Sequence, residues 1–253
     1  MGNLNTSGAA HPDLAAGTME VSEADKLKAV VGERIALRVQ SGQTIGIGTG
    51  STVDKAIDAI ARRIEKEGLS VNVVPSSYDS AIRLGEKGLK VLDPRTVSRV
   101  DWYVDGADEV LRGPLCCIKG NGAAHTNEKI LAKKAGEFVV IVDGSKMVER
   151  LGSKFPIPIE VLPSTKHLVI KDLLDLGASE VTLRPSKGGK HGAVVTENNG
   201  LVLDARFDFI DPGLEVQIKA ITGVIESGLF VRNRPSEVIV AHSLSDIEVL
   251  RAS

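Results

Sequence analysis

The sequence predicts an α/β fold, a Rossmann-like parallel sheet with helices on both faces, plus a smaller inserted α+β domain. Short apolar runs that suit buried strands alternate with helical periodicity from residue 25 to residue 142. Loops rich in glycine, aspartate or serine follow three of these runs, at 48–52, 105–108 and 143–146. Because a parallel sheet gathers the carboxyl ends of its strands along one edge, we expect these three loops to meet there.

Each element of the main sheet has its own pattern. Apolar residues at three- and four-residue spacing predict helices, and short apolar runs predict strands. The expected order is a helix at 25–40, a strand at 44–48, a helix from 52 to 64, a strand at 71–75, a helix at 79–87, strands at 90–92 and 101–104, a helix at 126–136 and a strand at 138–142. Thr126 is the expected N-cap of the helix at 126–136.

The pattern changes after Lys154. The segment 155–163 has regularly spaced prolines and predicts extended chain, and it is followed by a helix at 165–176 and a strand at 180–184. A turn at 198–200, a strand at 201–203 and a helix at 214–221 come next. Two helices among short strands predict a small α+β domain at 155–229. The segments 224–231 and 238–241 are expected to return to the main sheet, so the catalytic domain comprises 23–154 and 230–253.

Composition limits the classes of function. The chain has 253 residues, of which 42% are hydrophobic and 25% charged, an ordinary balance for a soluble globular protein. Its formal net charge of −2 argues against a nucleic-acid partner. No apolar run approaches the roughly 20 residues of a membrane span. The adjacent Cys116 and Cys117 form no disulfide framework, which fits a cytoplasmic protein, and no metal motif is present.

Residues 1–22 are interpreted as a disordered N-terminal tail. This segment is rich in Gly, Ala, Ser, Thr and Asn and shows no periodicity. It lacks the apolar core of a signal peptide and the arginines of a transit peptide. A weak targeting segment is the alternative, and a plastid form would require a photosynthetic source.

The glycine-rich turn at 46–52 suits an anion. A strand, a glycine turn and a helix start bring free backbone N–H groups and the positive end of a helix dipole to one point. Thr49, Ser51 and Thr52 add hydroxyl donors beside Gly50. No lysine follows the glycines as in a P-loop, and a tight turn with an N-cap is the alternative interpretation.

Two acidic groups flank Gly106-Ala107. Asp105 and Asp108 lie at a strand end, where their mutual repulsion is expected to raise the pKa of one of them. Such a pair can exchange protons with sugar hydroxyls or hold a metal. A solvated turn is the alternative, since Asp and Gly are common in turns.

The segment 119–128 carries the strongest catalytic signal. Lys119 can neutralise a developing oxyanion and Glu128 can act as a base, with Gly120, Asn121 and Gly122 forming the loop between them. The helix dipole and Lys119 should both lower the pKa of Glu128, whereas desolvation would raise it. Alternatively, Glu128 has no catalytic role and only interacts favourably with the helix dipole in the first turn. Lys146 could grip a phosphate or be an ordinary surface lysine, and His125 is a weaker candidate for polarising a carbonyl.

These blocks closely resemble the ribose-5-phosphate isomerases of the A type. The matching segments run in family order and lie at 46–52, 104–109, 118–124, 126–129, 154–161, 195–200 and 221–230. Only the tail lies outside the resemblance. Asn121 stands where the family often has Gly, and His125 where an apolar residue is common.

The resemblance implies interconversion of ribose 5-phosphate and ribulose 5-phosphate in the non-oxidative pentose phosphate pathway, without a metal or other cofactor. It implies that Glu128 moves the carbon proton, that Lys119 stabilises the oxyanion, and that Asp105 and Asp108 assist ring opening. Substrate contacts are expected from two loops and one lysine: Thr49, Gly50, Ser51, Thr52, Asp105, Gly106, Ala107, Asp108, Lys119, Gly120, Asn121, Gly122 and Lys146. It also implies a homodimer or homotetramer.

Two other functions compete. An aminosugar-phosphate deaminase on the same scaffold would need a different acid/base set from Lys119 and Glu128. A sugar-phosphate-sensing domain of a repressor would carry a helix-turn-helix reader, and no such segment fits before Asp25.

Overall fold

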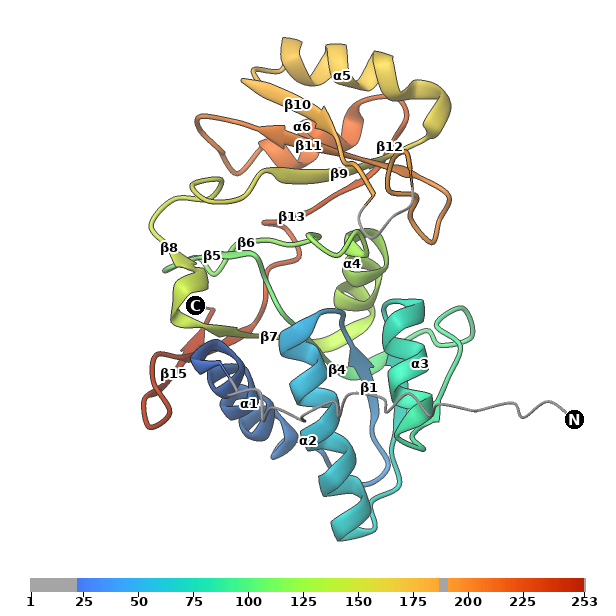
Figure 1. The fold of residues 1–253 in the computed structure, drawn as a ribbon, viewed down its shortest axis with the longest axis vertical. Helices are drawn as coiled ribbons and strands as arrows, with labels where there is room; N and C mark the ends of the chain where they lie inside the picture. Colours follow the sequence, from blue (N-terminus) through green and yellow to red (C-terminus); the bar gives the residue numbers. More distant parts are fainter. Residues whose placement is uncertain (1–21, 187–190, 253) are drawn as a thin grey trace, which may run out of the picture.

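A mostly parallel sheet forms the lower half of the molecule as drawn in Figure 1. This computed structural model describes residues 22–186 and 191–252. Among these residues the sheet has seven strands, in the spatial order β15 (Ile247–Arg251), β14 (Glu237–Ala241), β7 (Ala135–Asp143), β4 (Val100–Asp105), β1 (Thr44–Ile47), β2 (Asn72–Pro75) and β3 (Lys90–Val91). All neighbours are parallel except β15, which runs antiparallel to β14. The predicted α/β class is confirmed.

The direction of chain winding reverses between β1 and β4. From β1 the chain moves outward through β2 to β3, whereas β4, β7 and β14 extend the sheet on the other side. Ile45 of β1 pairs with Val73 on one side and with Trp102 on the other. A reversal of this kind opens a crevice beyond the carboxyl ends of the two central strands, where ligands of such sheets bind.

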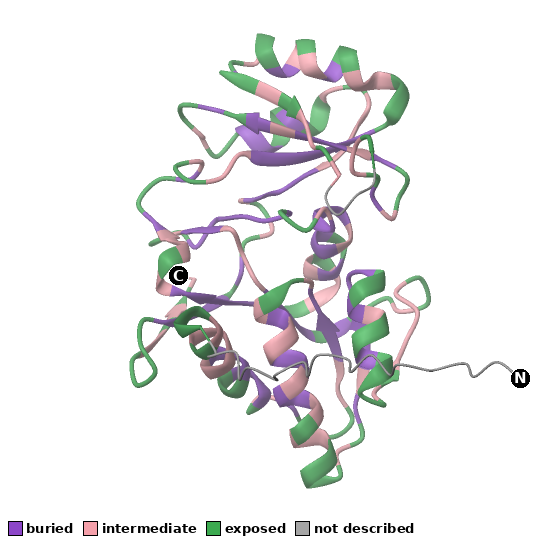
Figure 2. Cartoon of the chain, viewed as in Figure 1, coloured by how far each residue is buried: buried purple, intermediate pink, exposed green. Residues whose placement is uncertain are grey.

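Helices cover both faces of this sheet. On one face α1 (Glu23–Ala36), α2 (Ser51–Glu67) and α3 (Tyr78–Glu86) bury residues such as Ile35, Ile60 and Leu84 in one apolar cluster. On the other face Leu131 of α4 (His125–Lys134) packs with Phe138 in a second cluster. The buried residues of the helices face the strands (Figure 2). The predicted two-faced covering is therefore observed.

The remaining described strands form two smaller sheets. One contains β10 (Glu180–Leu183), β11 (Leu201–Arg206), β9 (Ile157–Val161) and β12 (Val224–Ser227), and it packs with α5 (Lys166–Asp175) and α6 (Leu214–Ala220). The other contains β13 (Leu229–Phe230), β6 (Cys117–Ile118), β5 (Glu109–Leu111) and β8 (Met147–Val148). Figure 1 shows this short-stranded sheet between the other two. The described residues also form two 3₁₀ turns, η1 (Gly144–Lys146) after β7 and η2 (Pro163–Thr165) before α5.

The structure corrects three local predictions. The segment 224–231 does not join the main sheet, because β12 pairs with β9 and β13 pairs with β6. Its local apolar pattern suits any buried strand and does not encode the partner. Thr126 is not an N-cap: Ala124 holds that position, and the Thr126 hydroxyl donates to the buried carboxylate of Glu160. Ser22, placed in the tail, accepts a hydrogen bond from the Asp25 amide and caps α1.

The predicted tail otherwise lies outside the described residues, at 1–21. The domain limits after 154 and 229 remain our proposal. None of the helices formed by the described residues has the length and apolar character that a membrane span requires.

Candidate active site

The loops after β1 and β4 meet at the reversal point of the sheet. Gly48 lies so close to Asp105 that a Cβ atom on Gly48 would be 2.1 Å from Asp105 Oδ1, so only glycine fits there. Asp105 Oδ1 accepts hydrogen bonds from the backbone N–H groups of Gly106, at 2.8 Å, and Thr49, at 3.2 Å. The two loops are thus joined through one carboxylate.

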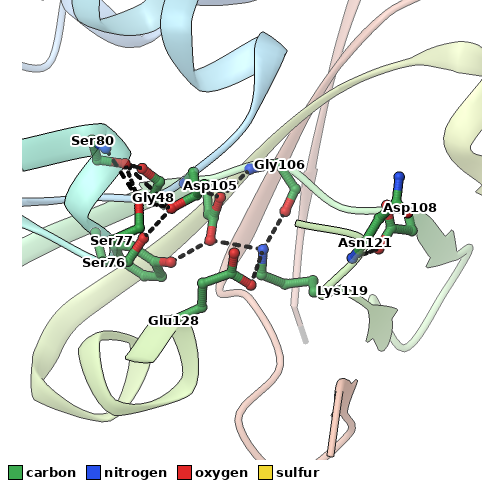
Figure 3. Close-up of polar contacts among 12 residues, drawn as sticks. Gly48, Ser76, Ser77, Ser80, Asp105, Gly106, Asp108, Lys119, Asn121 and Glu128 are labelled. Atoms are coloured by element: carbon green, nitrogen blue, oxygen red, sulfur yellow. Dashed lines mark hydrogen bonds and ion pairs between the residues drawn. The ribbon is translucent and has the colours of Figure 1, made fainter. Parts of the chain in front are cut away.

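Lys119 brings the predicted acid/base residues into one cluster. Its Nζ lies 2.7 Å from Asp105 Oδ2 and 3.1 Å from Glu128 Oε2, and it donates to the Gly106 carbonyl at 2.6 Å (Figure 3). Lys119 follows β6 and Glu128 lies in the first turn of α4. The exposed fractions of Asp105, Lys119 and Glu128 are 0%, 2% and 3%. Three charges, two negative and one positive, are therefore held almost free of solvent.

This environment makes the Glu128 carboxylate a stronger base than an ordinary glutamate. Burial raises its pKa well above the ordinary value, the charge of Asp105 acts in the same direction, and the charge of Lys119 opposes both. Burial alone would lower the pKa of Lys119, but the charges of Asp105 and Glu128 outweigh it and raise that pKa. The sequence did not show whether desolvation or the charge of Lys119 has the larger effect on the pKa of Glu128. In the structure the effect of burial is larger. Glu128 Oε2 is held by its ion pair with Lys119 and by no other polar group in the described part of the chain.

Asp108 lies outside the charged cluster. Its Oδ2 accepts a hydrogen bond from the Asn121 amide at 3.0 Å, and it is only partly buried. Burial raises its pKa, and the Asn121 amide and Lys119 act against this rise. Repulsion by Asp105, the cause expected from their spacing, is therefore not what raises the pKa of Asp108.

The glycine loop from Lys119 to Gly122 closes over the site. Gly120 has a φ of +107°, and a Cβ atom there would be 2.8 Å from His125. A Cβ atom on Gly122 would be 3.8 Å from Thr49 Cγ2, so the loop faces the turn after β1. Arg184 Nη1 donates to the carbonyls of Gly120, at 2.8 Å, and Asn121, at 3.0 Å, a support that the sequence did not reveal. Burial lowers the pKa of His125 to about 3, so this residue is neutral under the loop.

A cluster of hydroxyls adjoins the turn after β1. Thr49 Oγ1 lies 2.8 Å from Ser76 Oγ, 2.7 Å from Ser77 Oγ and 3.2 Å from Ser80 Oγ. The three serines were not among the predicted site residues. Ser76 and Ser77 directly follow β2, so the strand-end rule could have found them, whereas Ser80 lies within α3 and carries no such signal.

The remaining predicted contacts lie around this cluster. Gly50, with a φ of +112°, is the N-cap of α2, and Ser51 and Thr52 form its first turn. A Cβ atom on Gly106 would be 4.0 Å from Thr52 Cβ. Lys146 lies in η1 at the end of β7, with Nζ 5.0 Å from the centre of the Phe155 ring. Its charge acts to lower the pKa of Asp108, so the two side chains lie within electrostatic reach of each other.

Metal ligands are not grouped at this site. Among residues 22–186 and 191–252, no group of three or more His, Cys, Asp or Glu side chains is placed to hold a metal ion.

Comparison with known proteins assigns this arrangement to a family. The model of ribose 5-phosphate isomerase A (phosphoriboisomerase A) matches residues 72–244. The chain belongs to the ribose 5-phosphate isomerase A family. The matched region contains Asp105, Lys119 and Glu128, and the glycine turn at 46–52 precedes it.

Individual relatives of the family cover nearly the whole chain. The chain is 44% identical to ribose-5-phosphate isomerase A of Methanothermobacter thermautotrophicus over 227 residues, 89% of this chain and 97% of that protein. It is 43% identical to that of Thermosynechococcus vestitus over 224 residues, 87% and 93% of the two chains.

Solved structures agree in fold. Ribose 5-phosphate isomerase A from Methanocaldococcus jannaschii is 37% identical with a TM-score of 0.85, covering 90% of this chain and 99% of that one. A D-ribose-5-phosphate isomerase in complex with phospho-erythronic acid is 34% identical with a TM-score of 0.86, covering 91% and 100%.

Proposed function

We propose that this chain is an aldose–ketose isomerase that interconverts D-ribose 5-phosphate and D-ribulose 5-phosphate through an enediolate, in the non-oxidative pentose phosphate pathway. The observation that carries the proposal is the buried cluster of Asp105, Lys119 and Glu128 at the reversal point of the sheet, in a member of this family. The ligand of the related structure, phospho-erythronic acid, combines a phosphate with a carboxylate. A carboxylate is planar and anionic, as an enediolate is.

Glu128 is proposed as the base that works on carbon. It removes the proton from C2 of the open-chain aldose, the electron pair forms the C1=C2 bond, and the carbonyl pair moves to O1. The hydroxyl proton of O2 then passes to O1, C2=O forms, and C1 takes the proton back from Glu128. A base of raised pKa suits a weak carbon acid because the proton affinities of donor and acceptor approach each other. The basic Glu128 described above supports this role.

Lys119 is proposed to stabilise the enediolate. Its pKa is raised, so it carries a positive charge at neutral pH, and it is almost free of solvent. A charge in a site without water interacts more strongly with a developing oxyanion than the same charge in water. Its bonds to Asp105 and Gly106 hold it in place before substrate arrives, so little reorganisation is needed.

Asp105 and Asp108 are proposed to have different roles in opening the sugar ring. Asp108 is partly exposed and has a raised pKa, so it can exchange a proton with the ring hydroxyls of the sugar. Asp105 is wholly buried and accepts several hydrogen bonds, so its main contribution is electrostatic.

The phosphate is proposed to bind between the turn at 49–52 and Lys146. The start of α2 offers free N–H groups and a dipole that favours an anion. The loop at 119–122 faces this turn across the site and is proposed to contact the sugar.

The chain is proposed to act as a homodimer or homotetramer in the cytoplasm. Leu37 of the segment after α1 is 61% exposed and borders a cavity of about 350 Å³ with Val249 of the edge strand β15. Charged residues line the same cavity, so this surface offers both apolar and ionic contacts to a second copy: Arg34, Arg38, Glu237 and Arg251. Cys116 and Cys117 are free thiols, as is usual in a reducing compartment.

The proposed reaction is tested with the purified protein. It is treated with EDTA, mixed with ribose 5-phosphate, and ketose formation is followed by ultraviolet absorbance. Rapid conversion supports the proposal. A folded protein that binds the sugar phosphate without converting it would contradict the proposal and favour a sensor.

A further inference from the structure

Tyr103 lies directly beneath the acid/base cluster. It is two residues before Asp105 in β4, so the two side chains point to the same face of the sheet. Its ring is wholly buried and stacks on Phe138, with ring centres 5.0 Å apart and an angle of 22° between the planes. Its hydroxyl donates a hydrogen bond to Asp105 Oδ2. Stacking therefore fixes the ring, and the ring fixes the hydroxyl.

Tyr103 completes the set of donors around Asp105. Oδ1 accepts from the backbone of Gly106 and Thr49, and Oδ2 accepts from Tyr103 and forms an ion pair with Lys119. An ionised carboxylate offers about four acceptor positions, so Asp105 is saturated. Burial, followed by the charge of Asp105, raises the pKa of Tyr103 well above its ordinary value, so the phenol keeps its proton and always donates.

We propose that Tyr103 is a positioning residue for the isomerisation, because its hydroxyl holds the Asp105 carboxylate in a fixed orientation and thereby keeps Lys119 aligned with Glu128. The inference rests on the proposed function and extends it to a residue that does not itself meet the reacting carbons. Without the hydroxyl, Asp105 Oδ2 keeps the ion pair with Lys119 but no hydrogen bond within the described residues. The carboxylate is then freer to rotate.

The charged groups around Asp105 determine the expected pH effect. They are Lys119 after β6, Glu128 from α4 and Asp108 from the loop after β4, and Lys146 acts on Asp108. Glu128 acts as a base only in its ionised form. The charge of Asp105 raises the pKa of Glu128, and the Tyr103 hydroxyl offsets part of that charge by donating to Asp105, so loss of the hydroxyl raises the pKa of Glu128 further. The acid limb of kcat/KM therefore moves to higher pH.

The test compares Tyr103→Phe with the wild type. Because a hydrogen bond to a charged group is involved, kcat should fall by about 10- to 100-fold, with KM for ribose 5-phosphate within about twofold, since Tyr103 is a buried positioning residue. The acid limb should shift upward by a measurable fraction of a pH unit. Tyr78→Phe, which removes a hydroxyl from a side chain that is 69% exposed, is the matched control and should change neither quantity.

A second variant separates the hydroxyl from packing. Phe138→Leu removes the stacked ring and keeps the phenol, so it should lower the melting temperature and, because the hydroxyl is loosened but not removed, move the acid limb less than Tyr103→Phe does. A folded Tyr103→Phe protein with wild-type kcat and an unmoved acid limb would overturn the inference. Loss of cooperative melting in Tyr103→Phe would also overturn it, because the hydroxyl would then determine folding. Wild-type turnover, measured first in the same assay, tests the function separately.

Discussion

Gly48 and Asp105 are in such close contact that the space of one Cβ atom on Gly48 is filled by the Asp105 carboxylate. This contact joins the ends of β1 and β4 and sets the position of the carboxylate that holds Lys119. A glycine at the end of β1 is thus a requirement of the charged cluster as well as of the turn.

The first prediction concerns this contact. Gly48→Ala should force Asp105 away, lowering the free energy of unfolding by about 1–3 kcal/mol, as overpacking does, and reducing kcat. Guanidinium unfolding and steady-state kinetics measure the two effects. Gly85→Ala is the control, because nothing lies within 4 Å of a Cβ atom there. In the exposed helix α3 it should be neutral or stabilising by up to about 1 kcal/mol. Equal stability of both variants would contradict the argument.

The second prediction concerns the buried ammonium group. Lys119→Met keeps most of the side-chain volume but removes the charge that stabilises the enediolate, so kcat should fall by about 10²–10³-fold. The pKa of Glu128 should rise further, because the charge of Lys119 lowers it in the wild type. Lys90→Met at an exposed position of β3 is the control. Retention of more than a tenth of wild-type kcat in Lys119→Met would argue against the oxyanion role.

The third prediction concerns the phosphate. Lys146→Ala should raise KM for ribose 5-phosphate by about tenfold or more, since it removes one charge from the proposed phosphate contact, and leave kcat within a few fold. Lys66→Ala serves as control, because Lys66 is exposed in the last turn of α2, at the opposite end of the helix from Ser51. An unchanged KM in Lys146→Ala would remove Lys146 from the site.

The fourth prediction concerns acid stability. The pKa of His125 is lowered to about 3 in the folded protein, so between pH of about 6.5 and about 3 the unfolded chain binds one more proton. The contribution of His125 to the free energy of unfolding is complete above this window and decreases within it by about 1.4 kcal/mol for each unit that the pH falls. His125→Gln does not titrate and should show a shallower decrease between pH 6.5 and pH 5 in guanidinium unfolding. Identical slopes would mean that His125 is protonated in the folded state.

Much of the site follows from the order of strands and loops. The residues at 48–52 and 105–108 could be predicted because the carboxyl ends of parallel strands share one edge. The segment 119–128 was predicted from its residue types, and it follows β6 of a small antiparallel pairing. The resemblance added the roles of these residues. Tyr103 could not, because an aromatic residue inside a strand has the same pattern whether it packs or donates a hydrogen bond. The raised pKa of Asp108 was anticipated, but its cause is burial, which depends on loops distant in sequence.

The parallel strands of the main sheet were predicted from their apolar runs, as were the strands near 155–163, 180–184 and 201–203 of the small α+β sheet. The edge strand β15 and the short-stranded sheet were not. Strands such as β6 and β13 are two residues long, too short for any periodicity. The partners of 224–231 depend on backbone pairing with β9 and β6, which the local sequence of that segment does not specify.

The central claim is that Glu128 transfers the carbon proton, and one measurement tests it directly. Turnover of ribose 5-phosphate is compared between wild type, Glu128→Gln and the control Glu86→Gln, which alters an exposed residue of α3. A general base contributes about 10²–10⁴-fold, so Glu128→Gln should lose at least 100-fold in kcat while its melting remains cooperative. Near-normal turnover in a folded Glu128→Gln protein would contradict the account.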